Sequence, residues 1–225
     1  MNFLPFTRPS IDEETIAAVA DVLRSGWLTS GPKVQAFEAA LSAYCGGRPV
    51  RAFNSGTATL EIALRLAGVK TGDEVITTPL TWVATANVIL EVGAKPVLVD
   101  IDPVTRNIDL DRMEAAITPR TKALMPVDLA GLPVDRDRLY AIAETRRLRV
   151  IEDAAQSFGG EYRGRRAGSF GRVGATSFFP AKPFGCYGDG GMIFWTDDRL
   201  ADAMRSLRVH GMGATKYENV RIGLN

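Results

Sequence analysis

A single lysine, Lys182, lies between two prolines in the segment SFFPAKPFG (177–185), directly after an apolar run. Pro180 and Pro183 restrict the backbone on either side of it. A lysine that is held in place and shielded from water has a lowered pKa and can act as a nucleophile, whereas a mobile lysine is a solvated surface charge. The segment alone does not decide between these two interpretations.

Asp153 is a second residue whose place suggests chemistry. It ends the apolar run RVIED (149–153), and two alanines follow it. A carboxylate at the tip of a buried strand is costly unless it has a partner. That partner is either structural, such as a helix N-terminus, or the cation of a ligand.

Two further segments could bind other parts of a ligand. NSGTAT (54–59) joins small residues to a predicted helix start, which suits an anion, although Ser55 or Thr57 could also be a simple N-cap. Trp82 lies in PLTWVATAN (79–87), where it is either a core residue or a flat surface on which a ligand ring stacks.

All four segments lie at or just after the end of a predicted strand. The predicted strands are 50–53, 74–79, 96–101, 122–127, 149–153, 174–179 and 191–195. Several of these runs are continuously apolar, as expected for strands buried on both faces. Their alternation with helical patterns predicts an α/β fold with a mostly parallel seven-stranded sheet and helices on both faces. Ligands bind at the carboxyl ends of the strands in such sheets, so the four segments should meet there.

The first helix is predicted to begin after Ser10, with Glu13 completing a capping box, and to end at Gly26. No internal repeat or linker-like composition divides the chain. We therefore interpret residues 1–225 as one large domain, which includes an N-terminal helical segment at about residues 1–48. Further helical patterns occupy 57–68, 81–94, 109–117, 136–145 and 198–209.

Composition and charge argue against several other functions. A net charge of +1 leaves no excess of basic residues for a nucleic acid or an anionic membrane. Cys45 and Cys186 have no metal-ligand spacing and are interpreted as free thiols of a cytosolic protein. The N-terminus lacks a signal-peptide pattern, and no apolar run reaches the roughly 18 residues of a membrane span. We therefore expect a soluble, cytoplasmic protein without a metal site.

The four segments together match the needs of one cofactor. Pyridoxal 5'-phosphate (PLP) needs an anion site for its phosphate, a surface for its ring, an acid beside its pyridine nitrogen and a lysine for a Schiff base. The acid keeps the ring nitrogen protonated, so that the ring can accept the electron pair released at the substrate carbon. The sequence therefore predicts a PLP site at the carboxyl edge of the sheet.

The sequence resembles the DegT/DnrJ/EryC1/StrS family of PLP-dependent nucleotide-sugar aminotransferases, which have the type I fold of PLP enzymes. The resemblance implies that the chain is the large domain of such an enzyme and lacks the smaller C-terminal domain, because it ends within a family motif. The matching segments follow the family's order: SGWLTSGP, NSGTATLEIAL, GDEVITTPLTWVATAN, GAKPVLVDID, ITPRTKALMPV, IEDAAQSFG, SFFPAKPFGCYGDGG and RVHGMG…YENVRIGLN.

The resemblance also implies a role for each site residue. Lys182 would form the internal aldimine and move protons between the sugar carbon and the cofactor, and Asp153 would pair with the pyridine nitrogen. Gln156 would lie near the ring oxygen, and Trp82 would stack on the ring. The phosphate would be held by Gly56, Thr57 and Ser177, and by Asn225 from the neighbouring subunit, which implies a homodimer with shared sites.

The function implied by the resemblance is transfer of an amino group, typically from glutamate, to a keto-sugar of a nucleoside diphosphate, as in polysaccharide biosynthesis. The segments GWLTSGP and FLPF are most similar to enzymes that act on uridine-linked 3-keto or 4-keto sugars. One alternative is a truncated, non-catalytic PLP-binding or regulatory protein. A second is a PLP-dependent sugar dehydratase, but those relatives replace the lysine with histidine, so Lys182 favours amino transfer.

Three other features bear on these interpretations. Asp128 is a departure from the family pattern, in which histidine is frequent, and it bears on the substrate side of the site. His210 is the only histidine of the chain and is interpreted as structural, because it lies at a predicted helix end. A plain nucleotide-binding Rossmann domain is disfavoured because the glycine fingerprint of such domains does not occur.

Overall fold

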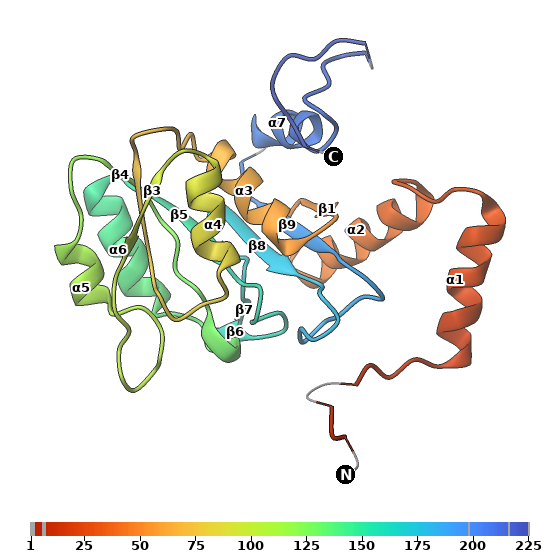
Figure 1. Ribbon diagram of the computed structural model, residues 1–225, viewed down its shortest axis with the longest axis horizontal. Helices are drawn as coiled ribbons and strands as arrows, with labels where there is room; N and C mark the ends of the chain where they lie inside the picture. Colours follow the sequence, from red (N-terminus) through yellow and green to blue (C-terminus); the bar gives the residue numbers. More distant parts are fainter. Residues whose placement is uncertain (1–2, 6–7, 198, 216, 225) are drawn as a thin grey trace.

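The computed structural model describes residues 3–5, 8–197, 199–215 and 217–224 (Figure 1). Its helices are α1 (Glu13–Ser25), α2 (Pro32–Tyr44), α3 (Gly56–Leu66), α4 (Ala84–Glu91), α5 (Leu110–Ala115), α6 (Arg136–Arg146) and α7 (Arg199–Leu207), with a short 3₁₀ turn η1 (Leu129–Gly131). Its strands are β1 (Val50–Phe53), β2 (Glu74–Thr77), β3 (Lys95–Leu98), β4 (Thr121–Leu124), β5 (Arg149–Asp153), β6 (Glu161–Tyr162), β7 (Arg165–Arg166), β8 (Val173–Ser177) and β9 (Gly191–Trp195).

Seven strands form one sheet in the order β1-β9-β8-β5-β4-β2-β3. Neighbouring strands are parallel in the five-strand part β3-β2-β4-β5-β8. Strand β9 is antiparallel to both of its neighbours, β8 and β1. These are the seven strands predicted from the sequence, and the mostly parallel α/β fold is confirmed. The short β6–β7 hairpin is an addition that the sequence pattern does not predict.

Some predicted strands end earlier than expected. The strand predicted at 122–127 stops at Leu124, and Val127 makes only an isolated bridge to Asp153. Pro126 has no N–H to donate to a ladder, which explains the interruption. The strand predicted at 96–101 likewise stops at Leu98. Both differences lie at the carboxyl edge of the sheet, where the chain leaves it.

Helices cover both faces of the sheet, and successive strand residues pack on opposite sides. Val75 belongs to a core shared with α3, α4 and α7, whereas its neighbour Ile76 packs with α5 and α6. On β9, Ile193 joins the first core and Phe194 packs under α2. Burial of apolar side chains on both faces fixes the register of the sheet, because a shift of one residue would exchange the faces.

Helix α1 stands away from the sheet and buries none of its side chains (Figure 1). Its predicted end at Gly26 is confirmed, since Gly26 has a left-handed φ of 72°. The capping box predicted from Ser10 and Glu13 is wrong. Asp12 is the N-cap instead, and its Oδ1 accepts a 2.8 Å hydrogen bond from the N–H of Thr15. The helix therefore begins at Glu13, where a carboxylate cap precedes two further acidic residues.

None of the helices in the described part of the chain is long and apolar enough to cross a membrane. The helices other than α1 cover the sheet, and the starts of α3 and α4 shape its carboxyl edge. Two of the four predicted ligand segments connect a strand to a helix, one from β1 to α3 and one from β2 to α4. The third is the loop that follows Asp153 at the end of β5. The fourth follows β8 and contains Lys182.

Candidate functional site

One cavity at the carboxyl edge of the sheet brings the predicted site residues together. It has a volume of about 60 Å³. Asn225, the eighth predicted residue, lies outside the described residues. The other seven all line this cavity: Gly56, Thr57, Trp82, Asp153, Gln156, Ser177 and Lys182.

The anion end of the cavity is built from the start of α3 and the end of β8. Ser55 is the N-cap, and its hydroxyl oxygen accepts a 3.1 Å hydrogen bond from the N–H of Ala58. The structural role considered for Ser55 is thus real, and it leaves the first N–H groups of the helix directed at the cavity. A Cβ on Gly56 would lie 2.7 Å from the Cβ of Ser177, so only glycine allows this approach.

Asp153 ends β5 with its side chain buried in the floor of the cavity, where it is 3% exposed. Its Oδ2 accepts a 2.8 Å hydrogen bond from the Thr85 hydroxyl, and its Oδ1 accepts a 3.2 Å bond from the N–H of Ala155. Burial raises the pKa of the Asp153 carboxyl, and the two hydrogen bonds and the charge of Lys182 offset part of that shift. The carboxylate is therefore under-compensated and favours a cation beside it.

Lys182 lies on a hydrogen-bonded turn after β8. Its N–H donates to the carbonyl of Phe179 at 2.8 Å, and the N–H of Cys186 returns to the carbonyl of Phe178 at 2.7 Å. The turn holds the lysine in place, as predicted. The side chain is half-buried rather than shielded from water, because the neighbouring Phe179 and Phe184 are themselves exposed at the open edge of the sheet.

Trp82 is 71% exposed, so it is not a core residue. It lies in the segment between β2 and α4, at the mouth of the cavity. An exposed indole beside the cavity offers a ring face without losing any core packing.

Gln156 is oriented by the neighbouring loop. Its Oε1 accepts a 3.0 Å hydrogen bond from the N–H of Ala130 in η1. Ala130 has a positive φ of 52°, and Gly131 follows with a φ of 92°. This left-handed turn brings the Ala130 N–H against the Gln156 side chain and fixes the side of the cavity on which the amide lies.

The structure adds two threonines to the predicted set. Thr85 bonds Asp153, and the hydroxyls of Thr81 and Thr85 lie 2.8 Å apart, so that a short hydroxyl chain runs along the cavity wall. A signal for them exists in the sequence. Hydroxyl residues four apart in a segment that enters a helix lie on the same face, and this face follows a strand of the predicted site.

Asp128 and His210, the two other residues of interest, do not line the cavity. Asp128 is fully buried on the opposite face of the sheet, where both of its oxygens accept 2.5 Å bonds from Nη2 of Arg136. Asp128 therefore contacts the loops behind the cavity and not the cavity itself. His210 is exposed beyond the end of α7 with a φ of 54°.

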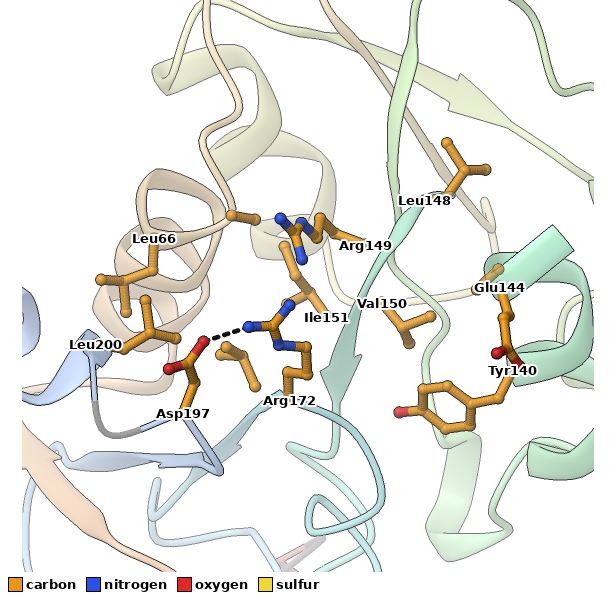
Figure 2. A pocket seen from close by; sticks show the side chains of 13 residues that line it. Leu66, Tyr140, Glu144, Leu148, Arg149, Val150, Ile151, Arg172, Asp197 and Leu200 are labelled. Atoms are coloured by element: carbon orange, nitrogen blue, oxygen red, sulfur yellow. Dashed lines mark hydrogen bonds and ion pairs between the residues drawn. The ribbon is translucent and has the colours of Figure 1, made fainter. Parts of the chain in front are cut away.

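A larger cavity, of about 620 Å³, lies at the opposite, amino edge of the sheet (Figure 2). Figure 2 shows an ion pair between Arg172 and Asp197 across it, with Leu66 and Leu200 on one side and Tyr140 on the other. None of the seven predicted residues in the smaller cavity lines this larger one. Its size alone does not make it the reactive site, because it contains none of the seven predicted site residues and most of its lining side chains are apolar.

The smaller cavity fits PLP by three independent observations. A helix start and a position that admits only glycine form a cradle for an anion. A buried carboxylate with an elevated pKa faces the cavity, where a protonated ring nitrogen would compensate it. A lysine on a hydrogen-bonded turn completes the cavity wall. Among the described residues, no group of three or more His, Cys, Asp or Glu side chains is placed to hold a metal ion.

Known proteins resemble this chain in sequence and in structure. UDP-2-acetamido-2-deoxy-3-oxo-D-glucuronate aminotransferase of Pseudomonas aeruginosa is 48% identical over 215 residues, which cover 96% of this chain and 60% of that protein. A DegT DnrJ EryC1 StrS aminotransferase from Brucella abortus superposes with a TM-score of 0.91 at 47% identity, over 93% of this chain and 58% of that one. NtdA from Bacillus subtilis, solved with bound cofactor PMP, gives a TM-score of 0.88 at 37% identity, over 93% and 48%.

The chain thus spans about 60% of the length of the curated relative. The Pseudomonas aeruginosa relative is named for a sugar substrate, and the Bacillus subtilis structure contains the cofactor PMP. The model of the DegT/DnrJ/EryC1/StrS aminotransferase family matches residues 9–225, which is almost the whole sequence. This chain belongs to the DegT/DnrJ/EryC1/StrS aminotransferase family, whose members depend on PLP.

Proposed function

We propose that this chain forms the PLP-binding part of an aminotransferase that transfers an amino group to the keto carbon of a nucleoside-diphosphate sugar. The observation that carries the proposal is the meeting of Asp153 and Lys182 in one cavity with the helix start at Gly56. These groups come from three different segments, and each supplies what one part of the cofactor needs.

When bound, PLP supplies an electron-withdrawing ring that stabilises the negative charge formed at the substrate carbon. Asp153 would hold a proton on the ring nitrogen, because its buried carboxylate gains most from an adjacent cation. Nζ of Lys182 would hold the cofactor in the resting state and move a proton when substrate is present. The Asp153 carboxylate does not itself leave its bonds to Thr85 and Ala155.

The remaining residues would bind and orient the cofactor. Gly56, Thr57 and Ser177 surround the anion end, where the first N–H groups of α3 favour a phosphate. Trp82 would cover one face of the ring. Gln156, oriented by Ala130, would lie beside the ring substituents.

The proposed sugar substrate follows the most informative relative. The name of the Pseudomonas aeruginosa protein describes amination of a 3-oxo sugar carried by UDP. We infer a nucleoside-diphosphate 3-keto or 4-keto sugar as the acceptor, and glutamate as the amino donor. Polysaccharide biosynthesis is the corresponding process.

We also propose a homodimer in which each chain completes the site of the other. Asn225 would reach the phosphate in the partner's site. The supporting observation is a set of exposed apolar side chains around the cavity, which a second chain would cover: Leu80, Trp82, Val83, Phe179, Phe184 and Tyr187. A cytoplasmic location is proposed as well, and the free thiols of Cys45 and Cys186 support a reducing compartment.

The first test is cofactor binding. The absorbance spectrum of the purified chain should change when PLP is added, and borohydride reduction followed by peptide mapping should place the label on Lys182. Lys182→Ala is the matched control and should remain unlabelled. A label on any other lysine would reject the assignment. PLP bound at Lys182 without exchange of amino groups with glutamate would favour the non-catalytic interpretation.

The second test concerns the shared site. Asn225→Ala chains are mixed with Lys182→Ala chains, and PLP bound to lysine is measured. In a shared site, one of the two sites of a mixed dimer carries both substitutions and the other carries neither, so about one intact site per mixed dimer should appear. A monomer that still holds PLP tightly would contradict the shared site.

A further inference from the structure

Behind the cavity, on the α6 side of the sheet, lies a buried ionic cluster. Asp128 and Glu152 are both fully buried, and Arg136 is 2% exposed. Nη2 of Arg136 donates to both oxygens of Asp128 at 2.5 Å and lies 3.9 Å from an oxygen of Glu152. One arginine thus joins two carboxylates that belong to different segments of the sheet.

Each of these carboxylates is tied to the segment that carries the site residues. Glu152 immediately precedes Asp153 in β5, and it accepts hydrogen bonds from the Tyr140 hydroxyl and the N–H of Gly171. Glu152 therefore anchors one side of the strand end, whereas Asp153 bonds Thr85 on the other. The end of β5 is fixed on both faces.

Asp128 fixes the turn that follows. Its backbone N–H donates to the carbonyl of Asp153 at 3.1 Å, and its Oδ2 accepts a 3.1 Å bond from the Ser157 hydroxyl. Two residues further on, the N–H of Ala130 donates to Oε1 of Gln156. The loop that begins at Asp128 therefore bonds the Asp153–Ser157 segment at its first residue, at its last residue and at the glutamine between them.

We propose that the Asp128–Arg136 pair is a positioning element, which holds the Asp153–Ser157 segment so that Asp153 and Gln156 face the cofactor in a single orientation. This inference rests on the proposed function, because it assigns these two residues their cofactor contacts. Neither Asp128 nor Arg136 lines the cavity, so the pair acts through the segment and not on the cofactor itself.

The pair suits this role because separating two buried charges costs free energy, and because other contacts restrain both side chains. Desolvation raises the pKa of Asp128, and the charge of Arg136 offsets part of that rise, so that the pKa is about 6 and the arginine favours the ionised carboxylate. The guanidinium also lies 5.0 Å over the ring of Phe170, which restrains it further. Because Asp128 bonds Arg136, Ser157 and the N–H of Val134, the turn that begins at Asp128 has little conformational freedom.

The test uses Ser157→Ala and Asp128→Asn. Ser157→Ala removes the bond between the segment and the Asp128 carboxylate, together with a longer 3.4 Å bond from the same hydroxyl to the Ala154 carbonyl, and it leaves the Asp128–Arg136 ion pair intact. In the PLP-free protein, amide hydrogen exchange in 154–157 should become about tenfold faster relative to the β5 amides of the same sample. In the PLP-saturated protein, kcat should fall by about tenfold or more while KM for the sugar changes little, because misplacement of a reacting group affects the transition state.

Asp128→Asn should give the same two changes. Its combination with Ser157→Ala should add little, because both substitutions break one connection. The matched control is Glu74→Gln, which also alters a buried carboxylate bonded to an arginine and a hydroxyl, Arg120 and Thr118, but at the amino edge of the sheet. It should lower stability and leave kcat and the exchange of 154–157 unchanged.

Unchanged exchange in 154–157, with wild-type kcat in folded Ser157→Ala, would overturn the proposal and leave the pair a purely structural one. Equal effects of Glu74→Gln would overturn it too. The exchange measurement needs no substrate. If the wild-type protein transfers no amino group, the proposed function fails, while the exchange measurement still decides whether the pair positions the segment.

Discussion

Thr85 in α4 and Asp153 at the end of β5 lie 68 positions apart, and a 2.8 Å hydrogen bond from the threonine hydroxyl to Oδ2 joins them. The bond connects a helix on one face of the sheet to the strand that carries the acid. It is donated to the charged form of Asp153 and therefore opposes the rise in pKa that burial causes. Thr85 thus belongs to the electrostatics of the site.

Thr85→Val is expected to weaken PLP binding and to lower kcat/KM by about tenfold, the usual effect of losing a hydrogen bond to a charged group. Titration with PLP and steady-state kinetics measure the two quantities. Thr77→Val is the control, because the buried Thr77 hydroxyl bonds the carbonyl of Met125 and not a carboxylate. Equal loss of PLP affinity in both variants would contradict a specific role for Thr85.

Asp153→Asn is expected to abolish amino transfer but to stabilise the PLP-free protein at alkaline pH. The pKa of Asp153 is higher in the folded chain than in the unfolded chain, so ionisation favours unfolding. Wild type should therefore lose stability relative to the variant as the pH rises above about 4, the ordinary range of an aspartate. Urea unfolding at several pH values measures the difference.

The control for this pH dependence is Asp102→Asn. Hydrogen bonds from Thr105 lower the pKa of Asp102, so here wild type should gain stability relative to the variant as the pH rises. A difference between wild type and Asp153→Asn that stays constant with pH would show that Asp153 is not forced toward its neutral form.

Gly56→Ala is expected to weaken PLP binding and to destabilise the chain by about 1–3 kcal/mol, because the new methyl meets the backbone-anchored side chain of Ser177. Calorimetry with PLP and thermal unfolding separate the two effects. Gly213→Ala is the comparison, since its nearest neighbour is the exposed side chain of Val220, at 3.0 Å and outside the site. Normal PLP affinity in Gly56→Ala would place the phosphate elsewhere.

Arg136→Met is expected to lower the free energy of unfolding by about 3–5 kcal/mol, because it leaves the carboxylates of Asp128 and Glu152 buried without a cation. Arg120→Met is the comparison, because Arg120 pairs with the buried Glu74 but is itself 66% exposed. This substitution should lower the free energy of unfolding by about 1 kcal/mol or less. Denaturant unfolding measures both. Similar losses in the two variants would mean that water reaches the Arg136 cluster.

The positions of the strands along the chain and the place of the site are predictable from the sequence because they depend on local patterns. Apolar runs such as that before Asp153 mark buried strands, and a serine before small residues marks the start of α3. Parallel strands share one carboxyl edge, so the segments that follow them meet. The lining of the cavity by seven predicted residues follows from this geometry.

The parts that the sequence does not predict depend on pairings between distant segments. The hydrogen bond from Ala130 to Gln156 requires a left-handed turn at a non-glycine residue, which no local pattern announces. The burial of Asp128 requires Arg136 from the next helix. The half-exposed state of Lys182 depends on what surrounds the turn in space, and the two prolines determine only its local shape.

The position of β1 in the sheet has a consequence for the order in which the fold assembles on the ribosome. β1 is an edge strand whose neighbour in the described sheet is β9, almost at the other end of the chain. The backbone of Gly191 in β9 packs directly against Ser55, where a Cβ would lie 2.6 Å from the serine carbonyl carbon. The contacts between β9 and the start of α3 therefore form only after residues 191–195 have been synthesised. Until then the N-cap of α3 lacks the backbone of Gly191, which packs against it in the folded chain.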